Sequence, residues 1–206
     1  MPAEIVAMPT SSRMTLIAVA LAAAVTPALA QDWPTHPVTM IVPFAAGGAF
    51  DVLGRILAPR MAETLGQQIV VENVAGAGGV IAAVRVAKAP PDGYQFLLGD
   101  SSFAYDQSLY KSPRYNAVDD FAPVGLIVDQ PTVLITRKDL PVENLAEFIA
   151  YAKANQAKMQ FGSAGAGSPI HLACVLLNLA IGVDVTHVPY RGGAPALQDL
   201  IGGRID

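Results

Sequence analysis

The feature that most constrains this chain is a strand-like apolar run that leads through a glycine turn into helix-like sequence. It is clearest between Val38 and Asp51, where Gly47 and Gly48 interrupt the apolar run. Two further glycine turns, Gly76–Gly79 and Gly162–Ser168, also follow apolar runs and precede helix-like sequence. Strand, turn and helix in this repeated order are typical of parallel sheets, so the pattern predicts an α/β fold.

Glycine turns of this kind suit anion binding. Because Gly47 and Gly48 carry no side chain, several backbone N–H groups can converge on one ligand. The helix that follows adds roughly half a unit of positive charge at its start, which favours a carboxylate without any arginine. Three such turns therefore predict a cleft for a small anion.

The first 30 residues are typical of a secretory signal. Arg13 precedes an unbroken apolar run, Met14–Val25, and the small residues Ala28 and Ala30 fit a signal-peptidase site before Gln31. The run is too short to span a bilayer. We therefore predict a signal peptide over residues 1–30 and a periplasmic mature protein, with a buried N-terminal helix as the alternative.

Composition narrows the function further. The 206 residues are 52% hydrophobic and 15% charged, which predicts an ordered globular chain. A formal charge of −4 argues against a nucleic-acid partner, and Cys174, the only cysteine, allows neither an internal disulfide nor a Cys-rich metal site. The sequence contains no G-x-S-x-G elbow, P-loop or G-x-G-x-x-G fingerprint. We predict neither an enzyme nor a cofactor.

The βα rhythm is regular as far as residue 99. In the first predicted helix, apolar residues recur every three or four positions, Pro59 is expected to kink the helix, and Gly66 suits its end. Function is not assigned between Phe103 and Phe121. The predicted elements are strands Val38–Val42, Gln68–Glu72 and Tyr94–Gly99, and helices Phe50–Leu65 and Val80–Lys88.

A boundary between two lobes is expected near Asp129. Two β-rich runs, Val124–Val128 and Thr132–Thr136, flank it and are predicted to carry the chain between a lobe of residues 31–128 and a lobe of residues 129–206. The second lobe repeats the βα rhythm and stops where Ile205 resembles the start of another strand, which predicts an incomplete lobe. Its predicted elements are a helix that begins at Asn144 with Glu147 in a capping box, strands Met159–Gly162 and Val183–Val188, helix Ile170–Ile181, and a helix opened by Pro195.

Several motifs together resemble one family over Trp33 to Asp206. Taken in order, they are similar to the Bug receptors, the extracytoplasmic solute-binding proteins of tripartite tricarboxylate transporters. The motifs are Ile41–Gly48 with Asp51, Val70–Asn73, Gly76–Gly79, Pro91–Tyr94, Asp120–Pro123, His171–Leu172 and His187–Gly193.

The resemblance implies a type II periplasmic-binding-protein-like architecture, with two α/β lobes of mixed sheets flanked by helices. It also implies a small carboxylated solute that is delivered to a membrane permease. In that family the loop matching Phe44 to Asp51 holds a carboxylate through backbone amides and bridging waters, and the loop matching Ser163 to Ser168 adds polar contacts. Relatives continue well past the position of Asp206, so the resemblance also predicts a C-terminally truncated chain.

Candidate ligand-binding residues follow from the turns and from the resemblance. Asp51 could bind the ligand or cap its helix, and Ser163 and Ser168 could meet the solute or satisfy helix N–H groups. His171 could face the cleft or make a structural hydrogen bond, and Arg191 could pair with a second carboxylate or be a solvated surface residue. The full set is Phe44, Ala45, Ala46, Gly47, Gly48, Asp51, Ser101, Ser163, Ala164, Gly165, Gly167, Ser168, His171 and Arg191.

Two departures from the family leave alternatives open. Phe50 stands where relatives often carry a hydroxyl residue, so it could form an aromatic wall of the site or simply pack in the core. The expected truncation makes a non-binding remnant of such a receptor the main rival to a carboxylate receptor. A secreted enzyme acting on a small anion is the remaining alternative.

Overall fold

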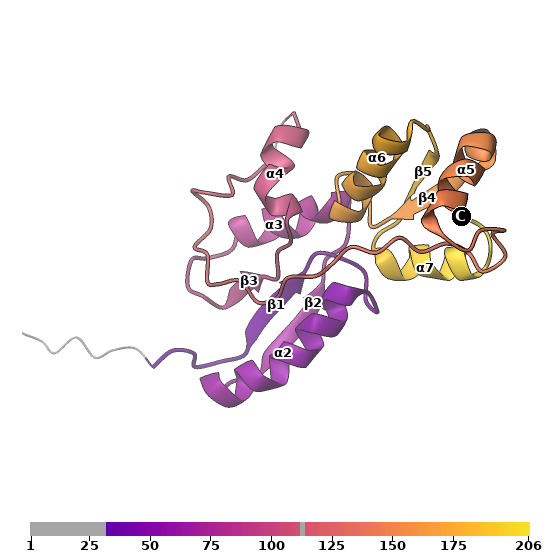
Figure 1. Ribbon diagram of the computed structural model, residues 1–206. Helices are drawn as coiled ribbons and strands as arrows, with labels where there is room; N and C mark the ends of the chain where they lie inside the picture. Colours follow the sequence, from indigo (N-terminus) through magenta and orange to yellow (C-terminus); the bar gives the residue numbers. More distant parts are fainter. Residues whose placement is uncertain (1–31, 112–113) are drawn as a thin grey trace, which may run out of the picture. The chain divides into compact units, whose positions relative to one another are not determined.

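The computed structural model describes residues 32–111 and 114–206 of the chain, of which Pro34–Asp206 form one unit by their contacts (Figure 1). The predicted signal peptide, residues 1–30, lies outside the described residues. Within the described part of the chain, every helix is too short or too polar to cross a bilayer.

The first sheet contains three parallel strands in the order β2-β1-β3. Strand β1 (Val38–Val42) pairs along its whole length with β2 (Ile69–Asn73) and is flanked on its other side by β3 (Gln95–Leu97). All three agree with strands predicted from the sequence, although β3 is shorter than expected. The central position of β1 explains its continuous apolar composition, because helices cover both faces of a parallel sheet.

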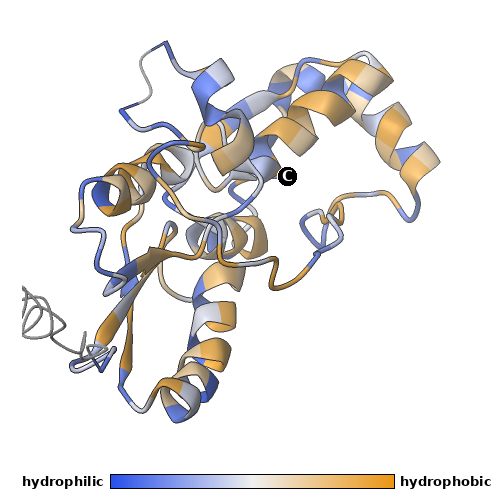
Figure 2. Ribbon diagram, turned by 90° about the vertical axis from the view of Figure 1, so that its left-hand side faces the viewer, coloured by the Kyte–Doolittle hydropathy of each residue, from blue (hydrophilic) through white to orange (hydrophobic). Residues whose placement is uncertain are grey.

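Alternation along β1 divides the core between those two faces. Val38, Met40 and Val42 are fully buried in a cluster with residues of helix α2 (Ala49–Leu65). Ile41 is equally buried and points to the opposite face, where helix α3 (Val80–Ala87) packs against β1 and β3. Apolar positions along the strands and along α2 are visible in Figure 2.

Helix α2 packs tightly on the sheet because of a glycine. A Cβ at Gly54 would lie 3.1 Å from the Met40 sulfur and 3.3 Å from a Val42 methyl group, so the helix backbone can approach the strands closely. The helix continues through Pro59 and ends at Gly66, which takes the left-handed conformation with φ of 68°. Phe50 packs against this core, which supports the core interpretation of that residue.

The second sheet pairs β4 (Gln160–Ser163) with β5 (Thr186–Pro189), again in parallel. Helix α5 (Leu145–Asn155) begins as predicted, with the Asn144 side chain accepting the Glu147 N–H. The remaining helices are α4 (Ser102–Leu109), α6 (Pro169–Ile181) and α7 (Gly193–Ile201), together with the short 3-10 turns η1 (Ala77–Gly79) and η2 (Gln156–Lys158).

The two β-rich runs stay outside both sheets. Val124–Val128 and Thr132–Thr136 pair with no strand among the described residues, and Val124 and Leu126 are 97% and 91% exposed. β-propensity alone cannot make a strand, because the backbone N–H and C=O groups need a neighbouring ladder. The predicted mixed sheets are also not seen, since every described strand pair is parallel.

Candidate functional site

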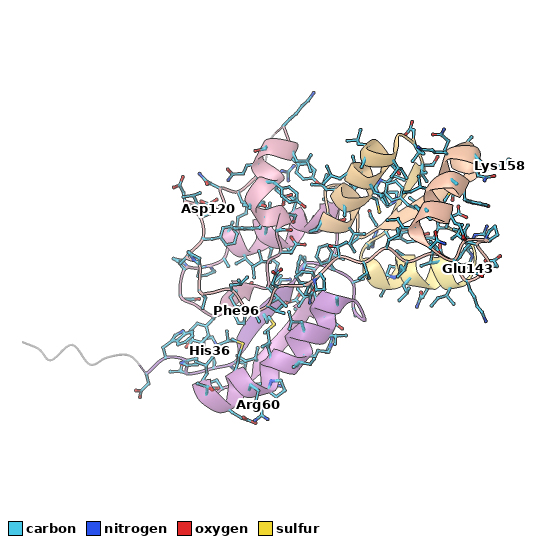
Figure 3. The ribbon with its side chains drawn as sticks, viewed as in Figure 1. His36, Arg60, Phe96, Asp120, Glu143 and Lys158 are labelled. Atoms are coloured by element: carbon cyan, nitrogen blue, oxygen red, sulfur yellow. The ribbon has the colours of Figure 1, made fainter. Side chains whose placement is uncertain are left out.

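Four turns leave the carboxyl ends of the strands, which is where open α/β sheets bind ligands. The first loop, Pro43–Gly48, follows β1, and the second turn, Val74–Gly79, follows β2. The second loop, Ser163–Ser168, continues from the last residue of β4, and the Arg191 turn, Tyr190–Gly192, follows β5. His36, which stacks on Tyr94, lies at the opposite end of β1 (Figure 3).

The second turn and the second loop meet backbone to backbone. A Cβ at Gly78 would lie 2.5 Å from the carbonyl oxygen of Ala166, and one at Gly165 would lie 3.1 Å from the Gly78 nitrogen. Only glycine permits so close an approach. The hydroxyl of Tyr110 adds a tie, because it donates to Ala166 O at 2.8 Å.

The first loop meets the Arg191 turn in the same way. The Ala45 N–H donates to the carbonyl of Arg191 at 3.0 Å, and a Cβ at Gly192 would lie 2.9 Å from the Ala45 nitrogen. The second loop also approaches the Arg191 turn, since a Cβ at Gly165 would lie 3.3 Å from the Tyr190 carbonyl oxygen. The four turns therefore gather main-chain groups from both sheets into one cluster.

Within the first loop, the structure corrects the prediction for one amide. The Gly47 N–H donates to Asp51 Oδ2 at 2.9 Å, so that donor is already used inside the loop. Asp51 is only 4% exposed and also pairs with Arg55, and the hydrogen bond from Arg55 holds the pKa of its carboxyl below the usual value. In this structure Asp51 organises the loop at the start of α2.

Two other amides of the first loop are open. Among the described residues, no hydrogen bond uses the N–H groups of Ala46 or Gly48, and Gly48 stands at the N-cap of α2 without a side-chain cap. These groups lie at the positive end of a 17-residue helix. The Phe44 carbonyl accepts from the Asn73 side chain at 3.0 Å, which fixes the start of the loop.

The serines of the second loop are buried and bonded within it. Ser163 is 1% exposed, and its Oγ lies 2.6 Å from Nε2 of His187 and accepts the Gly165 N–H at 3.1 Å. Ser168 is fully buried and accepts the His171 N–H at 3.3 Å, which makes it the N-cap of α6. Both serines therefore make structural hydrogen bonds within the loop and its helix.

The second loop also has open amides. The N–H groups of Ala164 and Ala166 make no hydrogen bond to any described residue. Gly165 and Gly167 take positive φ values of 121° and 82°, which turn the backbone sharply between these groups. The loop can therefore present main-chain donors even though its hydroxyls are occupied.

His171 makes a structural hydrogen bond at the start of α6. Its Nδ1 accepts the Gly167 N–H at 3.1 Å. Its ring stacks on His187, with 4.0 Å between the ring centroids, and Phe161 stacks against both imidazoles, at 5.0 Å from His187 and 6.3 Å from His171. Burial lowers the pKa of both imidazoles, and the neighbouring charge of His171 lowers that of His187 further.

The last two candidate residues lie at the rim of the cluster. Arg191 is exposed, and its guanidinium makes no hydrogen bond or ion pair within the described part of the chain. Ser101 is exposed at the start of α4 and interacts with the Tyr105 hydroxyl. Both are accessible to a solute in a way that Asp51 and the two loop serines are not.

Sequence reasoning missed three residues that hold the second loop. They are Tyr105, whose hydroxyl donates to Gly167 O at 3.1 Å, together with Tyr110 and His187. The tyrosines lie in a segment with weak periodicity, and they approach the loop only after folding. His187 carried a weak signal, because it precedes a glycine turn in the same way that Ser163 does.

Two hollows are found in the described structure. One, of about 10 Å³, touches the first loop at Pro43 and the second turn at Gly79 and is lined by Asp100, Asp106 and Tyr115 among others, which is room for about one water molecule. Burial raises the pKa of Asp106 to about 6. The other, of about 530 Å³, lies beside α2 and the start of β2 and is open to solvent. Within the described residues, no three metal-ligating side chains come together.

Known proteins resemble this chain throughout its described part. The model of the "tripartite tricarboxylate transporter family receptor" matches residues 53–206. The UPF0065 protein in the TAR-I ttuE-ttuC' intergenic region of Agrobacterium vitis is 46% identical over 193 residues, which are 92% of this chain and 56% of that protein. This chain therefore spans little more than half the length of that relative.

Solved structures agree in both fold and sequence. The periplasmic binding protein BugD is 46% identical, with a TM-score of 0.83 over 84% of this chain and 58% of its own. MatC from Rhodopseudomonas palustris, solved with bound malate, is 41% identical, with a TM-score of 0.79 over 84% of this chain and 60% of its own. The architecture is that of periplasmic binding proteins, and the chain belongs to the receptor family of tripartite tricarboxylate transporters.

Proposed function

We propose that this protein is an extracytoplasmic receptor that captures a small carboxylate for uptake by a tripartite tricarboxylate transporter. The family, and a relative solved with bound malate, support this class of solute. The proposal includes secretion through residues 1–30, delivery to a membrane permease, and lobes of residues 31–128 and 129–206.

One observation carries the proposal. Among the described residues, open main-chain N–H groups occur on the first loop, at Ala46 and Gly48, and on the second loop, at Ala164 and Ala166. A carboxylate accepts several N–H bonds at once, and bonds to an ionised acceptor are the stronger kind. In our mechanism the solute docks on the first loop, and the second loop then closes on it, because only the closed form contacts the solute from both sides.

The rim suggests the chemical class of the solute. Arg191 is the unpaired cation of the Arg191 turn, and the Ala45–Arg191 backbone hydrogen bond holds this turn against the first loop. A second carboxylate on the solute would pair with its guanidinium. Phe50 packs on the core, so it does not supply the aromatic wall that would favour a flat aromatic solute. We therefore favour an aliphatic dicarboxylate.

Removing a single N–H tests the docking step. Gly48→Pro deletes one open donor at a φ of −82°, which is close to proline's own range, and Gly48→Ala keeps the donor and adds only a methyl group. Isothermal titration calorimetry with malate should show about a tenfold loss of affinity or more for Gly48→Pro, and little change for Gly48→Ala. Thermal melting of each variant checks that it is folded.

Three outcomes separate the proposal from its rivals. Binding of aliphatic dicarboxylates without chemical change, read by calorimetry and by NMR of the solute, supports a receptor. Turnover of the solute would identify a secreted enzyme. A cooperatively melting chain that binds none of a panel of mono-, di- and aromatic carboxylates would identify a non-binding remnant and overturn the proposal.

A further inference from the structure

Three helices of this chain begin with the same hydrogen bond. In each, the side chain three residues after the N-cap reaches back and accepts the N–H of the residue before the N-cap. In α2 Asp51 accepts from Gly47 at 2.9 Å, in α5 Glu147 accepts from Glu143 at 2.8 Å, and in α6 His171 accepts from Gly167 at 3.1 Å. Glu143 marks the α5 example in Figure 3.

The three acceptors differ in how they respond to protons. A carboxylate accepts N–H bonds at any pH above its own low pKa, whereas an imidazole accepts only through an unprotonated nitrogen. The bond from Gly167 therefore requires a neutral His171 with its proton on Nε2. A protonated ring would turn an N–H toward the Gly167 N–H and place a positive charge at the positive end of α6.

A second imidazole makes protonation still less favourable. His187 stacks on His171 and bonds to Ser163, so charge on either ring is felt by the other and by both ends of the second loop. The other titratable groups on elements that adjoin the loop are Tyr105 and Tyr110 of α4, which bond to its carbonyls, Cys174 of α6, and Tyr190, whose N–H donates to the Ser163 carbonyl. Burial raises the pKa of all four, so they stay uncharged near neutrality.

No described carboxylate offsets a charge on the pair. The hydrogen bonds of His171 and His187 go to Gly167, Ser168 and Ser163, and no ion pair among the described residues involves either ring. The arrangement therefore selects the neutral form of both rings, while Asp51, with its Arg55 partner, selects the ionised form at the equivalent place in the first loop.

We propose that His171 and His187 are positioning residues that hold the second loop in its closed form only while both rings are neutral, so that acidification releases this loop and leaves the first loop intact. The consequence for the solute rests on the proposed function: affinity for a carboxylate falls in acid because one half of the site opens. The conformational part stands on the geometry of the loop alone.

The direction with pH follows from the lowered pKa of the two rings. Their ordinary value is 6.5, and the folded protein holds them below it. The stabilisation that the neutral rings provide is therefore complete above about pH 6.5 and is lost as the pH falls through the folded value. The first loop keeps its bond over this range, because the pKa of Asp51 is lowered from 3.8.

NMR of the solute-free protein tests the conformational part. As the pH is lowered from near 7.5 to near 5, the Gly167 amide signal should shift and lose protection from hydrogen exchange, with the same midpoint as the His171 ring. The Gly47 amide should not change over this range. A Gly167 amide that ignores the titration of His171 would overturn the inference.

Variants at His171 test the consequence for binding. His171→Asn keeps an acceptor with the same reach as Asp51 but cannot titrate, and His171→Leu removes the acceptor. Affinity for malate should fall about tenfold or more in acid for the wild type, stay nearly constant for His171→Asn, and be low at both pH values for His171→Leu. Glu147→Gln at the α5 example is the matched control and should keep the pH dependence of the wild type.

Failure of the inference can be told apart from failure of the proposed function. If His171 and Gly167 titrate together but no carboxylate binds, the proposed function fails and the loop mechanism stands. If malate binds with the same affinity from near pH 7.5 to near pH 5, the proposed function stands and the inference fails. If the affinity of His187→Gln for malate no longer depends on pH, the His187 ring accounts for the larger share of the effect.

Discussion

The first loop and the second loop are built alike and differ in the chemistry of one side chain. Both follow a parallel strand, both contain glycines with positive φ, and both end in a helix whose third residue accepts an N–H from the loop. The acceptor is a carboxylate paired with Arg55 in one and an imidazole stacked on a second imidazole in the other. Equal backbone geometry therefore does not confer equal sensitivity to protons.

The largest expected effect lies where the second turn meets the second loop. Gly78→Ala places a methyl group 2.5 Å from the Ala166 carbonyl oxygen at a φ of 63°. We expect the free energy of unfolding in urea to fall by about 3 kcal/mol. Gly66→Ala is the control, because its φ of 68° is similar and nothing lies within 4 Å, and it should cost about 1 kcal/mol. Equal losses of unfolding free energy in the two variants would mean that the second turn and the second loop do not touch.

Removing the acceptor of the first loop should have the next largest effect. Asp51→Ala leaves the Gly47 N–H without its partner and frees Arg55, and we expect unfolding in urea to become easier by about 2 kcal/mol. Asp51→Asn keeps an acceptor for Gly47 and should lose about half of that. Because the pKa of Asp51 is lowered, its stabilisation is present above pH 3.8 and is lost only below it. If the wild-type protein loses stability near pH 6 and Asp51→Asn does not, the first loop would be the pH-sensitive one, contrary to our expectation.

Replacing Asp106, a buried acid of helix α4, is expected to increase the stability of the protein. Asp106 is 2% exposed and accepts from the Tyr115 hydroxyl at 2.8 Å, and burial raises its pKa from 3.8 to about 6. Its ionised form is disfavoured in the fold, so stability is highest below pH 3.8 and falls as the pH rises to about 6. Asp106→Asn should therefore be more stable near pH 7.5 by about 1 to 2 kcal/mol, after allowing for solvent screening.

The same variant removes a confounding titration. Asp106, with a pKa raised to about 6, titrates within the pH range of the binding experiment and lies on α4, which carries the tyrosines that hold the second loop. If Asp106→Asn binds malate with the pH dependence of the wild type, the histidines cause that dependence. If the dependence disappears, the proton acts through α4, and the contrast between Asp51 and His171 loses its functional meaning.

The smallest expected effect is at the tie between α4 and the second loop. Tyr110→Phe removes the hydroxyl that donates to Ala166 O at 2.8 Å, and we expect a loss of about 1 kcal/mol in urea unfolding. Tyr105→Phe, which loses the longer bond of 3.1 Å to Gly167 O, should cost no more. Faster exchange of loop amides in both variants, with little change in the first loop, would confirm that the tyrosines serve the second loop.

Local pattern was enough for much of the fold. The apolar run Val38–Val42 matches β1, the stripe that ends at Leu65 with Gly66 matches α2, and Asn144 with Glu147 forms the predicted cap of α5. These features depend on neighbours close in sequence. The β-rich composition of Val124–Val128 and Thr132–Thr136 does not make them strands, because a strand depends on a partner from elsewhere in the chain.

Residue types and their spacing were enough to identify the family, the βα order and the positions of the glycine turns. Which amides stay open, in contrast, depends on contacts that form only in the folded chain. Asp51 occupies the Gly47 N–H, the loop serines turn inward, and His187 reaches Ser163 from a neighbouring strand. Hydrogen-bond partners are chosen by three-dimensional proximity, and residues 24 positions apart, such as Ser163 and His187, become neighbours only when β4 and β5 pair.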